Sequence, residues 1–215
     1  MSRFGQDGEQ AGDQAGDANT RCTCLPFDDP TRRDVLAAPV VFGMALVLPG
    51  AAMAQGANAG ENERAKVGDV FVPIDGGGHN PIEPRDVPLG GPPIFAWPME
   101  PATRLVRNGS RLNKVLLLRL DPAMLEGATR DHAADGVVAY TVICPHTGCD
   151  VTGWLAEPKL LECPCHNSQY NPHADGALVT GPAPRPLPAL PLKIADGKLM
   201  VAKPFTSRVG FTPGG

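Results

Sequence analysis

Aromatic residues are scarce in this chain of 215 residues, with two Trp, two Tyr and seven Phe making up 5% of it. A large aromatic core is therefore excluded. A surplus of basic charge is also absent, because the formal net charge is −4, so we expect no nucleic-acid partner. Six cysteines are too few for a disulfide-dense scaffold. Gly and Pro, in contrast, account for 49 residues, which predicts short strands and many turns rather than long helices.

The N-terminal part of the chain has the composition of an export leader. Residues 1–30 are dominated by small and polar side chains that bury little surface, which predicts a disordered n-region. Arg32 and Arg33 precede an uncharged stretch with an apolar run over 35–48 and an Ala-Met-Ala motif ending at Ala54. Paired arginines before such a run are typical of twin-arginine signals. Residues 31–54 are therefore predicted to direct the chain to the periplasmic side of a bacterial inner membrane.

An alternative interpretation is that the leader is retained as a membrane anchor. Residues 35–54 are long enough to span a bilayer, although Pro39 and Pro49 weaken that interpretation. Cleavage near Ala54 would instead release a soluble protein. The C-x-C pair formed by Cys22 and Cys24 precedes the arginines and suggests no function.

The remaining chain is predicted to be a short linker, residues 55–66, followed by one all-β domain over residues 67–215. Runs rich in β-branched and aliphatic residues alternate there with Gly/Pro turns, and a helical turn is expected over 123–128. Short strands at close spacing predict an antiparallel sandwich or barrel. The strands are expected at residues 69–73, 115–120, 136–143, 151–155, 177–180, 190–194 and 198–202.

Two segments concentrate the cysteines and histidines of this domain. The first covers residues 144–149 and reads CPHTGC, and the second covers residues 163–170 and reads CPCHNSQY. Thirteen residues separate Cys149 from Cys163, enough for a β-hairpin that brings the two segments together. Two thiolates and two imidazoles suit either zinc or a pair of irons bridged by sulfide.

Four cysteines and two histidines exceed what one such site needs. Each segment offers one thiolate and one imidazole in a C-x-H or C-x-x-H spacing. Cys149 and Cys165 are then left over, and in an oxidising compartment we expect them to form a disulfide. A structural zinc site would leave this extra pair unexplained.

The two segments resemble the motifs of Rieske iron–sulfur proteins of the disulfide-bearing type, C-x-H-x-G-C followed by C-P-C-H-x-S-x-Y. Residues 181–184, with the sequence GPAP, match the proline-rich loop that covers the cluster in that family. The resemblance extends over roughly 96–203. It implies a Rieske-type antiparallel β sandwich or barrel whose small cluster-binding subdomain covers about 140–185.

The resemblance also implies the cofactor, one [2Fe–2S] cluster per chain. Cys144 and Cys163 would bind one iron, and His146 and His166 the other. Ser168 and Tyr170 match positions whose hydroxyls bond to cluster sulfurs in high-potential members. Asn167 departs from the glycine of many members, but Asn tolerates the left-handed backbone conformation that the loop requires.

The function implied is single-electron transfer as a subunit of an exported or membrane-associated oxidoreductase complex. Electrons would pass from a quinol or a catalytic subunit to a c-type cytochrome. The larger partner would be of the cytochrome b/c type or, as in arsenite-oxidase-like enzymes, of the molybdopterin type. No independent catalytic site is visible in the sequence. A soluble Rieske ferredoxin that serves an oxygenase is the alternative, and the leader and the Cys149–Cys165 pair disfavour it.

Overall fold

The computed structural model describes residues 60–75 and 78–211. The predicted n-region, the twin-arginine segment with Ala54, Cys22 and Cys24, and the first part of the predicted linker lie outside these residues. Within the described residues, no helix has the length and apolar character required to cross a membrane. The domain boundaries proposed from the sequence stay predictions.

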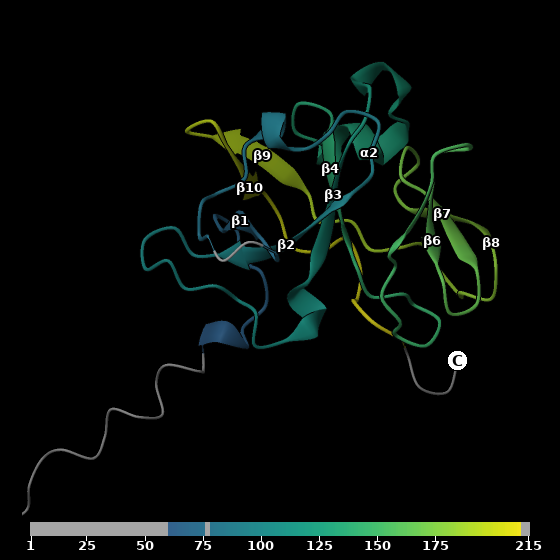
Figure 1. The fold of residues 1–215 in the computed structure, drawn as a ribbon, viewed down its shortest axis with the longest axis horizontal. Helices are drawn as coiled ribbons and strands as arrows, with labels where there is room; N and C mark the ends of the chain where they lie inside the picture. Colours follow the sequence, from purple (N-terminus) through teal and green to yellow (C-terminus); the bar gives the residue numbers. More distant parts are fainter. Residues whose placement is uncertain (1–59, 76–77, 212–215) are drawn as a thin grey trace, which may run out of the picture. The chain divides into compact units, whose positions relative to one another are not determined.

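The larger of two antiparallel sheets has six strands in the order β4-β3-β2-β1-β10-β9 (Figure 1). Its edge strand β4 also contacts the segment that leads into β9, because Leu190 N–H donates to Ala139 O at 2.8 Å. The sheet therefore curls into a half-barrel. Its strands are β1 Val70–Pro73, β2 Ile94–Met99, β3 Val115–Arg119, β4 Val137–Thr141, β9 Leu192–Ala195 and β10 Lys198–Val201.

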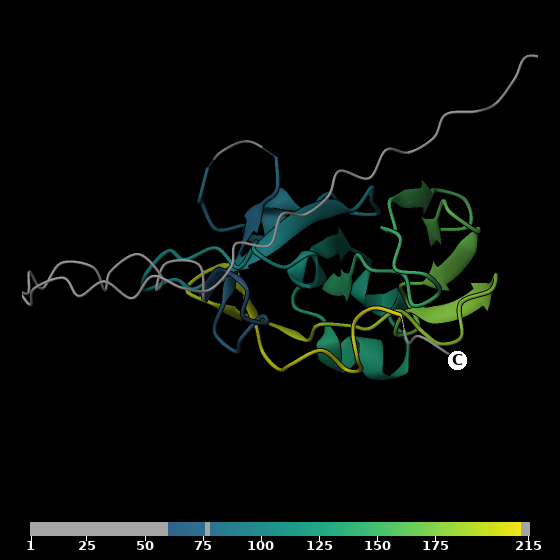
Figure 2. The same cartoon turned by 90° about the horizontal axis from the view of Figure 1, so that it is seen from below.

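The smaller sheet has four short antiparallel strands in sequential order and lies to one side of the larger sheet (Figures 1 and 2). A β5–β6 hairpin joins the two cysteine–histidine segments, as the sequence spacing predicted. The strands of this sheet are β5 Gly153–Leu155, β6 Leu160–Cys163, β7 Ser168–Asn171 and β8 Ala177–Thr180. The described part of the chain also includes helix α2 (Gly127–His132) and 3₁₀ turns at Pro84–Asp86, Arg111–Asn113 and Pro122–Met124.

Strands β3 and β4 separate two hydrophobic cores. Side chains alternate between the faces of a strand, so Val115 and Leu117 face one core while Leu116 and Leu118 face the other. We call the core enclosed by the larger sheet the inner core; it includes Phe71, Leu117 and Leu199. The outer core lies between β3–β4 and the smaller sheet. Burial on both faces explains why β3 and β4 read as nearly continuous apolar runs.

Part of the predicted linker packs against the domain. Arg107, which is 1% exposed, pairs with Asp69 at 2.7 Å and donates to Gly60 O at 3.2 Å. Asn113 Nδ2 donates to Glu63 O at 2.6 Å, and Ala65 packs against the inner core. Residues 60–66 are therefore held to the larger sheet by polar and apolar contacts.

The all-β prediction is confirmed, and all seven expected strands are present with bounds that differ by two residues at most. Three strands were missed: β2, β6 and β7. The single helical turn expected over 123–128 is instead two elements, the 3₁₀ turn Pro122–Met124 and α2. Gly127 adopts a φ of +45°, which starts α2 in a new direction.

Candidate [2Fe–2S] centre

Two loops with the same backbone turn form the candidate site. The first loop is residues 144–149, which follows β4, and the second is residues 163–168, which joins β6 to β7. In the first, Gly148 N–H donates to Cys144 O at 3.0 Å; in the second, Asn167 N–H donates to Cys163 O at 2.9 Å. Gly148 (φ +83°) and Asn167 (φ +54°) both adopt the left-handed conformation. The expectation that Asn167 can replace glycine is confirmed.

The loops place thiols and imidazoles at different depths. Cys144 and Cys163 are both free thiols and are buried in the outer core. His146 is half-buried, and His166 is exposed. Their rings meet edge to face, with centroids 4.6 Å apart and planes at 86°. Each loop thus contains one buried thiol and one more exposed imidazole, and the two imidazoles are in contact.

The donor set fits a [2Fe–2S] cluster. His146 Nδ1 is buried and has no hydrogen-bond partner among the described residues. A buried ring nitrogen without a partner is costly, and binding a metal would remove that cost. Burial also raises the pKa of the Cys163 thiol. A nearby cationic iron would lower that pKa and favour the thiolate that metal ligation requires. The assignment of Cys144, Cys163, His146 and His166 as ligands nevertheless stays a prediction.

The predicted disulfide between Cys149 and Cys165 is present and links the two loops. Cys163 Sγ and the two disulfide sulfurs lie within 4.8 Å of one another. Sulfurs already bonded to each other cannot act as thiolate ligands, so these three atoms do not form a metal site by themselves. The disulfide instead lies directly beside the predicted ligand Cys163.

The two hydroxyls singled out from the sequence lie deep in the site. Tyr170 Oη is 3.1 Å from Cys144 Sγ. Ser168 Oγ accepts a hydrogen bond from Ala183 N–H at 3.2 Å. A side chain at Gly181 would clash with Ser168 Cα, which explains why the proline-rich loop begins with glycine. The role of these hydroxyls toward cluster sulfurs stays a prediction.

Sequence reasoning missed a contact that supports the first loop from outside. Arg111 Nη2 donates to Gly148 O at 2.8 Å and pairs with Asp150 at 2.6 Å. Lys114 pairs with the same carboxylate at 2.9 Å. Burial raises the pKa of Asp150, but the two cations outweigh this and hold it below its ordinary value. Arg111 lies more than thirty residues before the loop, so local sequence offered no signal for it.

Buried thiols below a pair of imidazoles are the donor set expected of a mixed-ligand iron–sulfur centre in an electron-transfer protein. Comparison with known proteins identifies the family. The family model described as "Rieske [2Fe–2S] domain" matches residues 114–191, which include both loops.

Named relatives agree with this match. A cytochrome bc1 complex Rieske iron–sulfur subunit of Streptomyces lividans is 31% identical over 137 residues, 61% of this chain and 79% of that protein. A putative respiratory nitrate reductase subunit Rieske of Haloferax mediterranei is 34% identical over 111 residues, 51% of this chain and 49% of that protein. A cytochrome b6-f complex iron–sulfur subunit of Gloeobacter violaceus is 44% identical over 66 residues, 31% of this chain and 33% of that protein.

The chain belongs to the Rieske [2Fe–2S] protein family, and it carries one such cluster for single-electron transfer. It spans about four fifths of the Streptomyces relative but half or less of the other two. Among solved structures, the soluble domain of Rieske protein II from Sulfolobus acidocaldarius aligns at a TM-score of 0.37 and 23% identity, covering 47% of this chain and 66% of that one. A similarity at that level adds nothing to the assignment.

Proposed function

We propose that this chain is the Rieske subunit of an exported or membrane-associated oxidoreductase complex. It would pass single electrons from a quinol or a catalytic subunit to a c-type cytochrome. The observation that carries the proposal is the depth order of the site: two thiols buried in the outer core, His146 half-buried, and His166 exposed. This order makes the imidazole side the one that a partner can reach.

Each predicted ligand has a separate task in this proposal. Cys144 and Cys163 would hold the inner iron, while His146 and His166 would hold the outer one. When bound, the cluster accepts and releases one electron at a time. An imidazole that binds metal through one nitrogen keeps an N–H on the other. His166, the exposed ligand, can therefore hold a proton at that nitrogen and donate a hydrogen bond to a partner.

We infer further that the chain is exported through residues 31–54 and either cleaved near Ala54 or retained by an N-terminal anchor. The Cys149–Cys165 disulfide supports a location outside the cytoplasm, because disulfides persist in oxidising compartments. The same bond disfavours the alternative of a soluble ferredoxin that serves a cytoplasmic oxygenase. Terminal sequencing of the protein from its native source distinguishes cleavage from retention.

Isolation of the native assembly tests the proposed complex. The protein should copurify with a larger redox subunit, either of the cytochrome b/c type or of the molybdopterin type, and mass spectrometry would identify which. The isolated assembly should show a rhombic EPR signal of the Rieske kind in its reduced state. Copurification with an oxygenase component alone would contradict the proposal and favour the ferredoxin alternative.

A further inference from the structure

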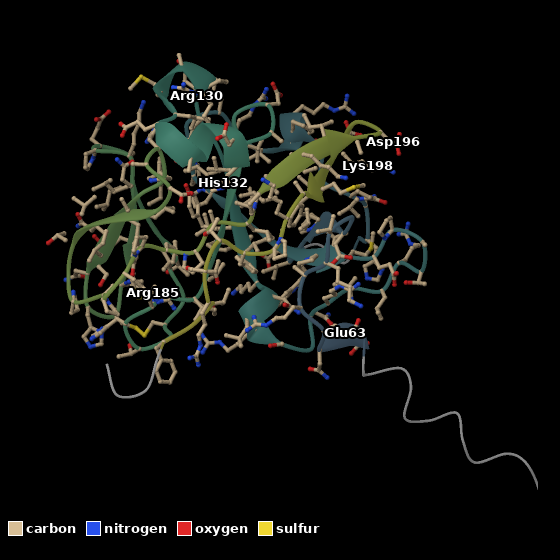
Figure 3. The ribbon with its side chains drawn as sticks, turned by 180° about the vertical axis from the view of Figure 1, so that it is seen from behind. Glu63, Arg130, His132, Arg185, Asp196 and Lys198 are labelled. Atoms are coloured by element: carbon tan, nitrogen blue, oxygen red, sulfur yellow. A yellow bond between two sulfur atoms is a disulfide. The ribbon has the colours of Figure 1, made fainter. Side chains whose placement is uncertain are left out.

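Four arginines form a cationic surface beside the first loop. Arg111 donates to Gly148 O at 2.8 Å, and Arg208 lines one hollow with Arg111 and a neighbouring hollow with Arg64. Arg185 extends from the proline-rich loop and donates to Gly210 O and to Ser207 Oγ, the latter at 3.5 Å. We call Arg64, Arg111, Arg185 and Arg208 the arginine face. Arg185 lies on the same side of the domain as the disulfide, away from Lys198 (Figure 3).

Few carboxylates balance this charge. Asp150 is shared between Arg111 and Lys114. Arg64 and Arg185 donate hydrogen bonds to neutral groups, and within the described residues no ion pair forms at Arg64, Arg185 or Arg208. Residues 204–211 contain no Asp or Glu. The face therefore carries an excess of positive charge, although Glu63 adjoins Arg64 in the chain and the chain as a whole carries a net negative charge.

The C-terminal segment that carries Arg208 packs against the first loop. Val209 is buried, Gly210 is buried, and the Phe211 ring lies against Gly148, where an added Cβ would be 3.1 Å from Phe211 Cδ1. The yellow C-terminal segment runs beside the smaller sheet in both Figure 1 and Figure 2. The backbone at Arg208 therefore lies close to the first loop, and its exposed side chain places positive charge beside the site.

We propose that the arginine face docks a redox protein that presents carboxylates around its own electron-exchanging centre. This inference rests on the proposed electron-transfer function and names the chemistry of the partner surface. Opposite charges at the contact accelerate the encounter and fix its orientation. One electron then passes from the reduced cluster to the partner, and no covalent bond forms or breaks. A lipid surface fits less well, because Phe211 is the only large exposed apolar residue within 204–211.

Two small oxidants, one anionic and one cationic, probe the electrostatic potential beside the site. The reduced, cluster-loaded protein is mixed in a stopped-flow instrument with ferricyanide or with tris(phenanthroline)cobalt(III), each of which accepts one electron. The wild-type rate with ferricyanide should fall as salt rises from about 10 to about 300 mM, because screening weakens attraction to the arginines. A protein that responded only to its net negative charge would show the opposite salt dependence.

Matched charge reversals show which part of the surface governs these rates. Arg64→Glu with Arg208→Glu should slow ferricyanide about 3- to 10-fold at low salt and should accelerate the cobalt complex. Lys193→Glu with Lys198→Glu makes the same change in net charge on β9 and β10, and it should alter both rates less than about 2-fold. Equal effects of the two double variants would overturn the proposal, since net charge rather than the arginine face would then govern the rates.

A binding measurement separates docking from electron transfer. Poly-L-glutamate should bind the oxidised wild-type protein at low salt in titration calorimetry, and the Arg64/Arg208 variant should lose that binding while the Lys193/Lys198 control retains it. Binding to phosphatidylglycerol vesicles without binding to poly-L-glutamate would overturn the proposal in favour of a membrane surface. EPR of each variant tests the electron-transfer function separately. Loss of the cluster signal would mean that this function has failed, whereas an intact signal with unchanged rates would count against the arginine face alone.

Discussion

The inner and outer cores share the wall formed by β3 and β4, yet they are built differently. The inner core consists of aliphatic residues and one Phe, most of them on the strands of the larger sheet. The outer core includes Cys144, Cys163 and Tyr170, and the sheet that covers it has strands of only three or four residues. The smaller sheet also leaves β5 and β8 half-buried or exposed.

We expect from this difference that the two halves rely on different sources of stability. Burial of apolar side chains stabilises the larger sheet. The smaller sheet, with its shorter strands, should depend in addition on the disulfide, the metal centre and its contact with β3–β4. Four changes, in order of decreasing effect, separate these contributions.

Removal of a predicted ligand should have the largest effect. Cys163→Ala or His146→Ala should abolish the rhombic EPR signal and the stoichiometric iron and acid-labile sulfide of the loaded protein. Far-UV circular dichroism should change little, because the larger sheet does not depend on the metal. An unaltered EPR signal in either variant would refute the ligand role of that residue, and zinc as the only metal in exported protein would refute the cluster assignment.

A cavity in the inner core should destabilise the fold and leave the cluster unchanged. Leu117 is fully buried there, so Leu117→Ala should lower the free energy of unfolding by about 2–5 kcal/mol. The thermal midpoint followed by circular dichroism should fall, whereas the EPR g-values at low temperature should match those of the wild type. Altered g-values would show that the two cores are coupled more tightly than their composition indicates.

Loss of the disulfide should destabilise the smaller sheet selectively. Cys149 and Cys165 are 16 residues apart, for which the chain-entropy estimate of stabilisation is about 3 kcal/mol. Cys149→Ser should therefore give a cluster that bleaches sooner on warming, read from its visible absorbance. Ala156→Ser, an exposed change in the β5–β6 turn of the same sheet, serves as the control. Bleaching at the wild-type temperature would contradict a stabilising role for the bond.

The hydroxyl substitutions should have the smallest effect. Tyr170→Phe and Ser168→Ala each remove a hydrogen-bond donor. The reduced cluster is more negative, so it loses more stabilisation than the oxidised cluster. A difference of about 1–2 kcal/mol in hydrogen-bond energy corresponds to about 40–90 mV for one electron. Both variants should load the cluster and show a lower midpoint potential in protein-film voltammetry, with the double variant lowest. An unchanged or raised potential in both would mean that the hydroxyls do not bond to the cluster.

The sequence predicted the class of fold and the meeting of the two loops, but it missed strands for identifiable reasons. β2 contains Pro98, which normally interrupts a strand. Its ladder with β3 ends at Ala96, so Pro98 lies beyond that ladder and is tolerated. In β7 the buried residues are Ser168 and Tyr170, whereas Gln169 and Asn171 are half-buried. Polar groups thus occupy the core positions, and a hydrophobic pattern cannot reveal such a strand.

The candidate site was predictable as far as its motif extended. The disulfide pairing and the left-handed conformation at Asn167 were anticipated from adjacent residues and are present. The sequence did not reveal the support from Arg111 or the docking of residues 204–211 against the first loop. Both arise from contacts between segments far apart in the chain, and no local pattern encodes them.

The turn shared by the two loops bears on how the cofactor is loaded. In each loop the backbone closes the turn with its own hydrogen bond, from Gly148 to Cys144 and from Asn167 to Cys163. Both bonds join backbone atoms, so neither occupies a sulfur or a ring nitrogen that the cluster would use. Loading of the cofactor can therefore leave both turns intact, while the metal centre adds stability to the sheet around them.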